Sequence, residues 1–313
     1  MHKDKPINGS SFFVLSRGSS LLKDLLLVKG YKDHEYLRKS FNQLATDTFG
    51  IEFETWYKNG YWTDKYLPYS FVVHNRVVAN VSVNFVNLVV NAEVKQAIQI
   101  GTVMTHPDYR NKGLSRRLME IVLDEYKHVD MIYLFANQTV LDFYPKFGFS
   151  SRDEVQFILD YNHMPPSSSK MRKLDVSNPD DLEYIYNLAS NRKVLSEVFG
   201  TSNCEELLMF YCIMVFSQDL YYLENENALV IFQREGDCIH LYDIVSSRKV
   251  NFQTVLSAIV PLDCSKVFFH FHPDQHELGY EKQLYKTNNV LFIKNQTNVT
   301  LPNEFKHPLT SQA

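Results

Sequence analysis

The chain has 313 residues, of which 45% are hydrophobic and 22% charged, with 11 Gly and 11 Pro. These proportions exclude a disordered, collagen-like or low-complexity protein, and the length predicts two domains of ordinary size. The 32 Lys and Arg against 36 Asp and Glu give a formal net charge of −4, so no overall electrostatic attraction to nucleic acid or to an anionic membrane is expected.

The cysteines and the N-terminal region predict a cytoplasmic protein. The cysteines all lie at or beyond Cys204 and show no Cys-x-x-Cys spacing, so neither a disulfide framework nor a zinc ribbon is expected. The apolar runs at 12–15 and 21–28 are interrupted by charged residues and are too short for a signal peptide or a spanning helix.

Hydrophobic periodicity predicts the elements of the first half. In chain order they are a strand at 25–29, helices at 34–48 and 52–58, strands at 69–74, 77–90 and 97–105, a helix from Gly113 to near His128, a strand at 131–136, a short helix with Leu141, Phe143 and Tyr144, and a strand at 154–161. Asn75 and Arg76 predict a tight turn between two of the strands. This order favours an α+β fold with one strand–helix–strand crossover.

Two prolines and three serines at 162–169 predict a linker between a domain at 1–161 and a second at 170–313. The order of elements then recurs, which favours an internal duplication with a C-terminal tail. The elements are a helix after Asn178, strands at 220–223, 228–233 and 238–245, a helix from Asn251, a strand at 266–272, a helical stretch at 277–285 and a strand at 290–294.

The segment 101–115 carries the clearest chemistry, because a strand leads through a basic turn directly into a helix. Main-chain N–H groups of the turn and of the helix start point the same way, Gly113 has no Cβ to block close approach, and Ser115 is small. The segment predicts a cradle for a pyrophosphate, although an ordinary turn glycine would also explain Gly113.

The same run resembles the signature of the GNAT superfamily of acyl-CoA N-acyltransferases, in which a strand ending Val-x-x-x-Pro precedes Arg/Gln-x-x-Gly-x-Gly/Ala at a helix start. The matching residues are Val103, Pro107, Arg110, Gly113 and Ser115, where Ser departs mildly from the pattern. The segment 141–149 resembles the family's second signature, Phe/Leu-Tyr-x-x-x-Gly-Phe. The resemblance covers about residues 20–161 and is tight over 99–149. Together with the recurring order of elements in the second half, it implies tandem GNAT-like folds, each with a mixed central sheet flanked by helices.

The resemblance implies an acetyl-CoA site. Main-chain groups of Val103 and Thr105 would bind the pantetheine arm, and an N–H near Thr105 would polarise the thioester carbonyl. Asn137 would bond the cofactor arm or a water. The implied cofactor-binding residues are Val103, Met104, Thr105, Arg110, Asn111, Lys112, Gly113, Leu114, Ser115, Arg116 and Asn137.

Tyr144 is the candidate general acid, because a phenol with a pKa near 10 can protonate a departing thiolate; the alternative is a core tyrosine. No general base is assigned. Many family members use a glutamate on the cofactor strand, but this strand offers Gln96, Gln99, Thr102 and Thr105. His106, Glu52, Glu54 or a chain of waters stays open.

Three further signals are weaker. The second half has no glycine at 246–252, and a side chain there would block the approach of a phosphate. The second lobe is therefore expected to bind no cofactor and to shape the acceptor cleft. His270 and His272 have a spacing that metal sites use, but no cysteine or carboxylate nearby completes a set, and no metal is expected. The aromatic residues between Trp56 and Tyr69 either wall the acceptor pocket or belong to the core.

The sequence therefore predicts an acetyl-CoA-dependent N-acetyltransferase in which a primary amine attacks the thioester directly within a ternary complex. The acceptor is expected to be a small-molecule or peptide amine. The alternative is a catalytically inactive acyl-CoA-binding sensor or scaffold, which the missing base favours.

Overall fold

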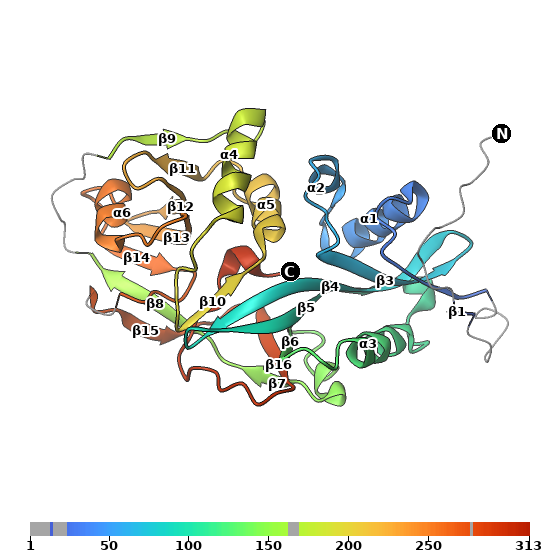
Figure 1. Cartoon of the computed structure of the whole chain (residues 1–313). Helices are drawn as coiled ribbons and strands as arrows, with labels where there is room; N and C mark the ends of the chain where they lie inside the picture. Colours follow the sequence, from blue (N-terminus) through green and yellow to red (C-terminus); the bar gives the residue numbers. More distant parts are fainter. Residues whose placement is uncertain (1–12, 15–23, 162–168, 276–277) are drawn as a thin grey trace.

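The structure is a computed structural model that describes residues 13–14, 24–161, 169–275 and 278–313. These residues form two mixed β-sheets with helices packed around them (Figure 1). The helices are α1 (Glu35–Phe49), α2 (Glu54–Lys58), α3 (Leu114–Glu125), α4 (Pro179–Ser190), α5 (Glu205–Met214) and α6 (Phe252–Ile259), with 3-10 turns η2 (Pro107–Tyr109), η3 (Tyr144–Phe147) and η5 (Leu309–Ser311). Within the described residues, no helix combines the length and apolar character needed to cross a bilayer.

The first sheet has the order β1-β2-β3-β4-β5-β6-β16-β7, with β10 paired to β4. Its strands are β1 (Phe13–Val14), β2 (Leu26–Lys29), β3 (Tyr66–Val73), β4 (Arg76–Val90), β5 (Glu93–Thr105), β6 (Met131–Asn137), β7 (Ser150–Arg152), β10 (Phe199–Ser202) and β16 (Asn289–Asn295). Helices α1 and α3 cover opposite faces of this sheet (Figure 1). The crossover through α3 joins the parallel pair β5 and β6, as the periodicity predicts.

The second sheet has the order β15-β8-β14-β13-β12-β11-β9. Its strands are β8 (Val155–Asp160), β9 (Met171–Lys173), β11 (Leu220–Leu223), β12 (Ala228–Glu235), β13 (Cys238–Val245), β14 (Lys266–Phe269) and β15 (Glu281–Leu284). A second crossover, through α6, joins the parallel pair β13 and β14. Each sheet thus contains one strand–helix–strand crossover, in agreement with the expected repeat and with an α+β fold.

The two sheets exchange strands, which contradicts the expectation that 1–161 and 170–313 form separate folds. Strand β8 pairs with β14 and β15 of the second sheet, whereas β16 inserts between β6 and β7 of the first. The reason is that apolar alternation predicts a strand but carries no information about its partner. Most of the expected linker, 162–168, lies outside the described residues.

Three local predictions also need correction. The turn between β3 and β4 is formed by His74 and Asn75, which both have positive φ, one residue before the expected position. The expected helix around Tyr144 is the short turn η3, which Gly148 ends with a φ of 82°. Residues 281–284 form β15 instead of a helix, because pairing with β8 at the sheet edge overrides local propensity.

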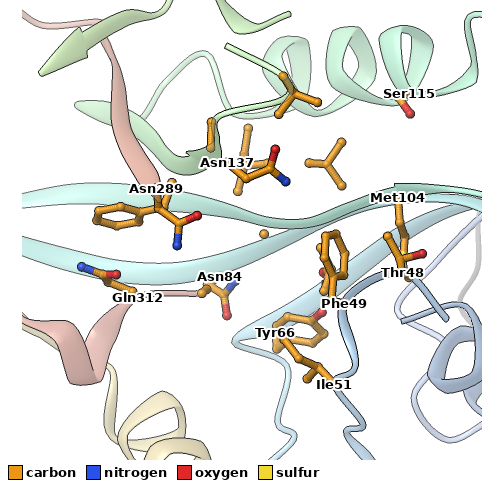
Figure 2. A pocket seen from close by; sticks show the side chains of 18 of the residues that line it. Thr48, Phe49, Ile51, Tyr66, Asn84, Met104, Ser115, Asn137, Asn289 and Gln312 are labelled. Atoms are coloured by element: carbon orange, nitrogen blue, oxygen red, sulfur yellow. Dashed lines mark hydrogen bonds between the residues drawn. The ribbon is translucent and has the colours of Figure 1, made fainter. Parts of the chain in front are cut away.

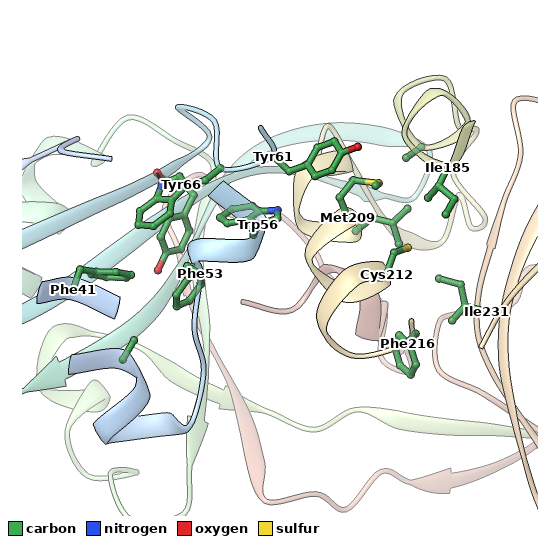
Figure 3. Close-up of a cluster of buried hydrophobic side chains, with 14 of the residues drawn as sticks. Phe41, Phe53, Trp56, Tyr61, Tyr66, Ile185, Met209, Cys212, Phe216 and Ile231 are labelled. Carbon is green, nitrogen blue, oxygen red and sulfur yellow. Dashed lines mark hydrogen bonds between the residues drawn. The ribbon is translucent and has the colours of Figure 1, made fainter. Parts of the chain in front are cut away.

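A shared hydrophobic core joins the two halves (Figure 3). Phe53 before α2 stacks on Phe210 of α5 with ring centroids 5.5 Å apart. The indole Nε1 of Trp56 donates to the carbonyl oxygen of Glu206 at 2.8 Å. These contacts fix α5 against the segment around α2, and the two together form one wall of the site described next.

Candidate active site

A cleft of about 770 Å³ opens where β5 and β6 separate (Figure 2). Their parallel pairing runs from Ala97 opposite Met131 to Ile100 opposite Leu134 and stops there. Both strands continue beyond this point, and their last residues line the cleft. A strand that loses its neighbour leaves main-chain N–H and C=O groups on that edge without ladder partners. The freed edge of β5 therefore offers hydrogen-bonding groups to an extended ligand.

A β-bulge changes the direction of β5 at the cleft. Ser82 of β4 pairs with Gly101, but Asn80 pairs with Met104, so β5 carries one extra residue between these pairs. Thr102 in the bulge has a φ of 43°. The buried amide Nδ2 of Asn80 donates to the carbonyl oxygen of Thr102 at 2.9 Å and holds the bulge in place. The bulge breaks the regular ladder where the cleft begins.

The turn after β5 leads to a helix start without a side-chain cap. Gly113 is the N-cap residue of α3 and has a φ of 73°. Because glycine has no side chain, this position supplies no capping hydrogen bond to the helix. A Cβ added there would have no protein atom within 4 Å. The first N–H groups of a helix need an outside acceptor, and their dipole favours an anion. The start of α3 therefore suits a phosphate group.

The corresponding helix of the second sheet, α6, has its first N–H groups satisfied by side chains. Asn251 Oδ1 accepts from the N–H groups of Gln253 and Thr254, and Gln275 Oε1 accepts from that of Phe252. Arg248 in the preceding turn donates to main-chain carbonyls at 225 and 226. The two helix starts are chemically different, although the elements around them are arranged alike.

We therefore expect one acetyl-CoA to bind per chain, at α3. Isothermal calorimetry should saturate at one equivalent, because the N–H groups at α6 are already bonded. The variant Asn251→Ala changes a residue at α6 of the other sheet and should leave the affinity of the site at α3 unchanged. Saturation at two equivalents, or loss of binding in Asn251→Ala, would contradict the assignment to α3.

The structure brings most of the expected cofactor residues to the cleft. Its lining includes Val103, Met104, Thr105, Arg110, Ser115, Asn137 and Tyr144. Outside the cleft, exposed along the turn and the start of α3, lie Asn111, Lys112, Gly113 and Arg116. The side chain of Leu114 is different, because it is buried in the core under α3 and leaves only the main chain for a ligand.

Two contacts order the lining polar groups. Ser115 Oγ and Thr105 Oγ1 are 2.7 Å apart, which ties the start of α3 to the end of β5. Asn137 Oδ1 accepts from the N–H and the hydroxyl of Thr139, in the turn after β6. These bonds orient Asn137 so that its amide Nδ2 has no acceptor among the described residues. It is available to a ligand in the cleft.

Tyr144 begins η3 and lies on the cleft with only 5% of its surface exposed. Its ring packs against Phe143, Phe149 and Phe292, the last of these on the exchanged strand β16. Burial raises the pKa of Tyr144 to about 12. The phenol is therefore protonated at neutral pH, as a general acid must be.

None of the candidate bases lines the cleft. His106 contacts Arg76 at 2.7 Å, Glu54 pairs with Arg38 at 3.0 Å, and Glu52 caps the start of α2. Among the described residues, no Asp, Glu or His side chain belongs to the lining. Among the described residues of the lining, Arg110 carries a charged side chain and the other side chains are neutral polar or apolar.

Sequence reasoning missed the segment 309–313, whose last two residues reach the cleft. Gln312 and Ala313 belong to the lining, and a Cβ at Gly101 would lie 3.2 Å from the carbonyl carbon of Ala313. Gln99 holds this segment: its Nε2 donates to the carbonyl of Ser311 at 2.8 Å, and its Oε1 accepts from the N–H of Ala313 at 2.5 Å. The sequence signal was a glutamine in the middle of an apolar strand.

We expect Gln99→Leu to speed hydrogen exchange of the amides in 309–313 by about tenfold, because each lost hydrogen bond contributes about 1 kcal/mol. Mass spectrometry of the exchanged peptides measures this effect. Gln43→Leu, which changes an exposed glutamine bonded to Asp47 on α1, is the matched control. Equal exchange in both variants would show that Gln99 does not hold the segment.

The histidines considered for metal binding follow β14 and are buried. His270 Nε2 lies 3.0 Å from His240 Nδ1, and burial lowers the pKa of His270 to about 3. His272 packs against Phe157. Within the part of the chain that the structure describes, no three His, Cys, Asp or Glu side chains are placed to hold a metal ion.

The comparisons with known proteins agree with this fold and this arrangement of the cleft. Residues 34–152 match the family model of an acetyltransferase (GNAT) domain. This segment is therefore a GNAT acetyltransferase domain, and the chain has a GNAT superfamily fold. No protein with a curated description matches the chain.

Several solved structures share the fold over most of the chain. A GCN5-related N-acetyltransferase from Kribbella flavida is 16% identical with a TM-score of 0.58, covering 90% of this chain and 73% of the other. Eis1 from Mycobacterium abscessus is 12% identical with a TM-score of 0.57, covering 87% and 73%. A conserved protein of unknown function from Enterococcus faecalis V583 is 14% identical with a TM-score of 0.59, covering 87% and 72%.

Proposed function

We propose that the protein transfers an acetyl group from acetyl-CoA to a primary amine by direct attack within a ternary complex. The observation that carries this proposal is the cleft itself. The freed edge of β5, the uncapped start of α3 and the buried phenol of Tyr144 meet around one opening. This arrangement supplies partners for a thioester arm, an anion and a leaving thiolate.

The residues act in a defined order. Arg110 and the main chain from Asn111 to Arg116 hold the pyrophosphate, and the edge of β5 at Val103 and Thr105 holds the pantetheine arm. An N–H near Thr105 donates to the thioester oxygen while the amine nitrogen attacks the carbonyl carbon. The new C–N bond replaces the C–S bond, and the Tyr144 hydroxyl gives its proton to the sulfur. The nitrogen loses one proton to water as the amide forms, and a proton from water restores the phenol.

The absence of an acidic or imidazole side chain in the described lining favours a second candidate, an acyl-CoA-binding sensor or scaffold without turnover. A thiol-release assay with acetyl-CoA across aromatic monoamines, polyamines, aminoglycosides, amino acids and peptides separates the two. Release that depends on an added amine supports the transferase. Binding of acetyl-CoA without release for any of these amines would support the sensor.

A further inference from the structure

A connected set of buried polar side chains lies next to the bulge in β5, and the proposed reaction does not use it. Tyr31, Ser70, Asn80 and Ser82 are each at most 2% exposed, and Tyr31 belongs to a hydrophobic core. Burying polar groups costs free energy unless each finds a hydrogen-bond partner. Apolar side chains could fill the same space without bonds, so what the polar set adds is the direction of its hydrogen bonds.

The hydrogen bonds of this set all follow from one donor direction. Ser70 Oγ donates to Asn80 Oδ1 at 2.8 Å, and because a serine hydroxyl has a single hydrogen, Tyr31 Oη donates to Ser70 Oγ at 2.6 Å. Burial raises the pKa of Tyr31 above its usual range, so the phenol keeps the proton that it donates. The amide of Asn80 is thereby held with its Nδ2 toward Ser82 Oγ and the carbonyl oxygen of Thr102, both at 2.9 Å.

The bulge is held in a conformation that a threonine does not adopt without support. Thr102 has a φ of 43°, and such a residue needs surrounding contacts that fix it. Asn80 supplies one contact, to the carbonyl oxygen, and Tyr66 Oη supplies another, 2.7 Å from Thr102 Oγ1 at the cleft (Figure 2). A turned amide of Asn80 would set Oδ1 against that carbonyl oxygen, and two acceptors repel each other.

The bond from Asn80 also sets the direction of the next main-chain N–H. A peptide unit is planar and trans, so the C=O of Thr102 and the N–H of Val103 point to opposite sides. The carbonyl is turned toward Asn80 on β4, and the N–H of Val103 is therefore turned away from β4, toward the edge that β6 leaves free. Val103 lines the cleft at this edge.

We propose that Asn80 is a positioning residue for the cofactor, because it aims the N–H of Val103 at a carbonyl oxygen of the pantetheine arm. This inference rests on the proposed function, which gives the main chain at Val103 to that arm. Asn80 itself is not in the lining of the cleft and acts only through the peptide unit that it holds. Ser70 and Tyr31 act one step further back, by fixing the amide of Asn80.

Calorimetry of CoA binding to Asn80→Leu tests the proposal. Leucine has a similar volume but no donor, so the peptide unit before Val103 is free to turn, and we expect the Kd of CoA to rise about tenfold, the effect of losing one well-aligned hydrogen bond. Gln156→Leu is the matched control, since Gln156 is a buried amide that donates to the carbonyl oxygen of Phe269 at 2.8 Å in the other sheet. Both variants should lose stability, but only Asn80→Leu should lose affinity. Unchanged affinity in Asn80→Leu, or equal loss in both, would overturn the proposal.

Ser70→Ala is a milder variant that decides the question if Asn80→Leu does not fold. It removes one hydroxyl and lets the amide of Asn80 turn, so the Kd of CoA should rise about threefold. Ser246→Ala removes a buried hydroxyl that donates to the carbonyl oxygen of Asn227 at 3.0 Å in the other sheet, and it should leave the Kd unchanged. A wild-type Kd in a folded Ser70→Ala variant would overturn the proposal.

The amide proton of Val103 gives a readout that a merely structural role of Asn80 would not move. In protein labelled with nitrogen-15 valine, with Val103→Ile identifying the signal, CoA should shift this proton downfield in the wild type and in Gln156→Leu. The shift should be lost in Asn80→Leu at saturating CoA. A shift of equal size in Asn80→Leu would overturn the proposal.

These readouts separate failure of the inference from failure of the proposed function. The expected differences in CoA binding without thiol release for any amine would support the positioning role and refute the transferase. Turnover of an amine together with unchanged CoA affinity in Asn80→Leu would support the transferase and refute the positioning role. Absence of CoA binding by the wild type would refute both.

Discussion

Replacement of Tyr144 by phenylalanine is expected to lower kcat by about 100-fold, the usual contribution of a general acid. The variant keeps the ring that packs against Phe149 and Phe292 and removes only the hydroxyl. Affinity for acetyl-CoA should change little, because the main chain of β5 and the start of α3 make the proposed cofactor contacts. Single-turnover rates with saturating acetyl-CoA measure the chemical step.

The pH dependence gives a second readout for Tyr144. A general acid loses activity above its pKa, and burial raises the pKa of this phenol to about 12. We therefore expect no fall in kcat from this group between neutral pH and pH values near 11. Tyr126→Phe is the matched control, since that buried tyrosine shares the core under α3 but is not in the lining. Wild-type kcat in Tyr144→Phe would assign Tyr144 to the core alone.

Replacement of Gly113 by valine is expected to weaken acetyl-CoA binding by at least about tenfold, or about 1.4 kcal/mol. The added Cβ meets no protein atom, so any obstruction concerns a ligand at the start of α3. The positive φ of 73° adds strain of about 1–2 kcal/mol, which lowers stability whatever the ligand does. Calorimetry and thermal unfolding of the same sample separate the two effects.

Gly236→Val is the matched control for this strain. Gly236 has a φ of 61°, has no protein atom within 4 Å of an added Cβ, and lies in the hairpin between β12 and β13 of the second sheet. Both variants should lose similar stability, but only Gly113→Val should lose affinity. Unchanged affinity in Gly113→Val, or equal loss in both, would remove the pyrophosphate from α3.

The strand, turn and helix beside the cleft could be predicted from the sequence, because their signals are local. The order of strand, basic turn and helix across 101–115 depends on neighbouring residues, and the structure has β5, η2 and α3 there. The aromatic residues near Trp56 illustrate an intermediate case. Trp56 and Tyr66 line the cleft, while Trp62 and Tyr69 are core residues. Some of these aromatic residues therefore form a pocket wall and others belong to the core, the two alternatives that the sequence left open.

The wall of the cleft that includes α5 depends on contacts distant in sequence and could not be predicted in the same way. Helix α5 has an almost uninterrupted apolar sequence, since it is buried between the halves, and so it shows no amphipathic period. Strands β8 and β16 exchange sheets, and β16 brings Phe292 against Tyr144. Neither pairing leaves a pattern in the sequence.

Counting CoA thiol and N-acetylated amine in the same reaction tests the central claim most directly. Direct attack of an amine on the thioester predicts equal amounts of the two products at every time point, and neither product without an added amine. Thiol release without acetylated amine would indicate hydrolysis of acetyl-CoA. That result would contradict the assignment of the cleft to amine acetylation.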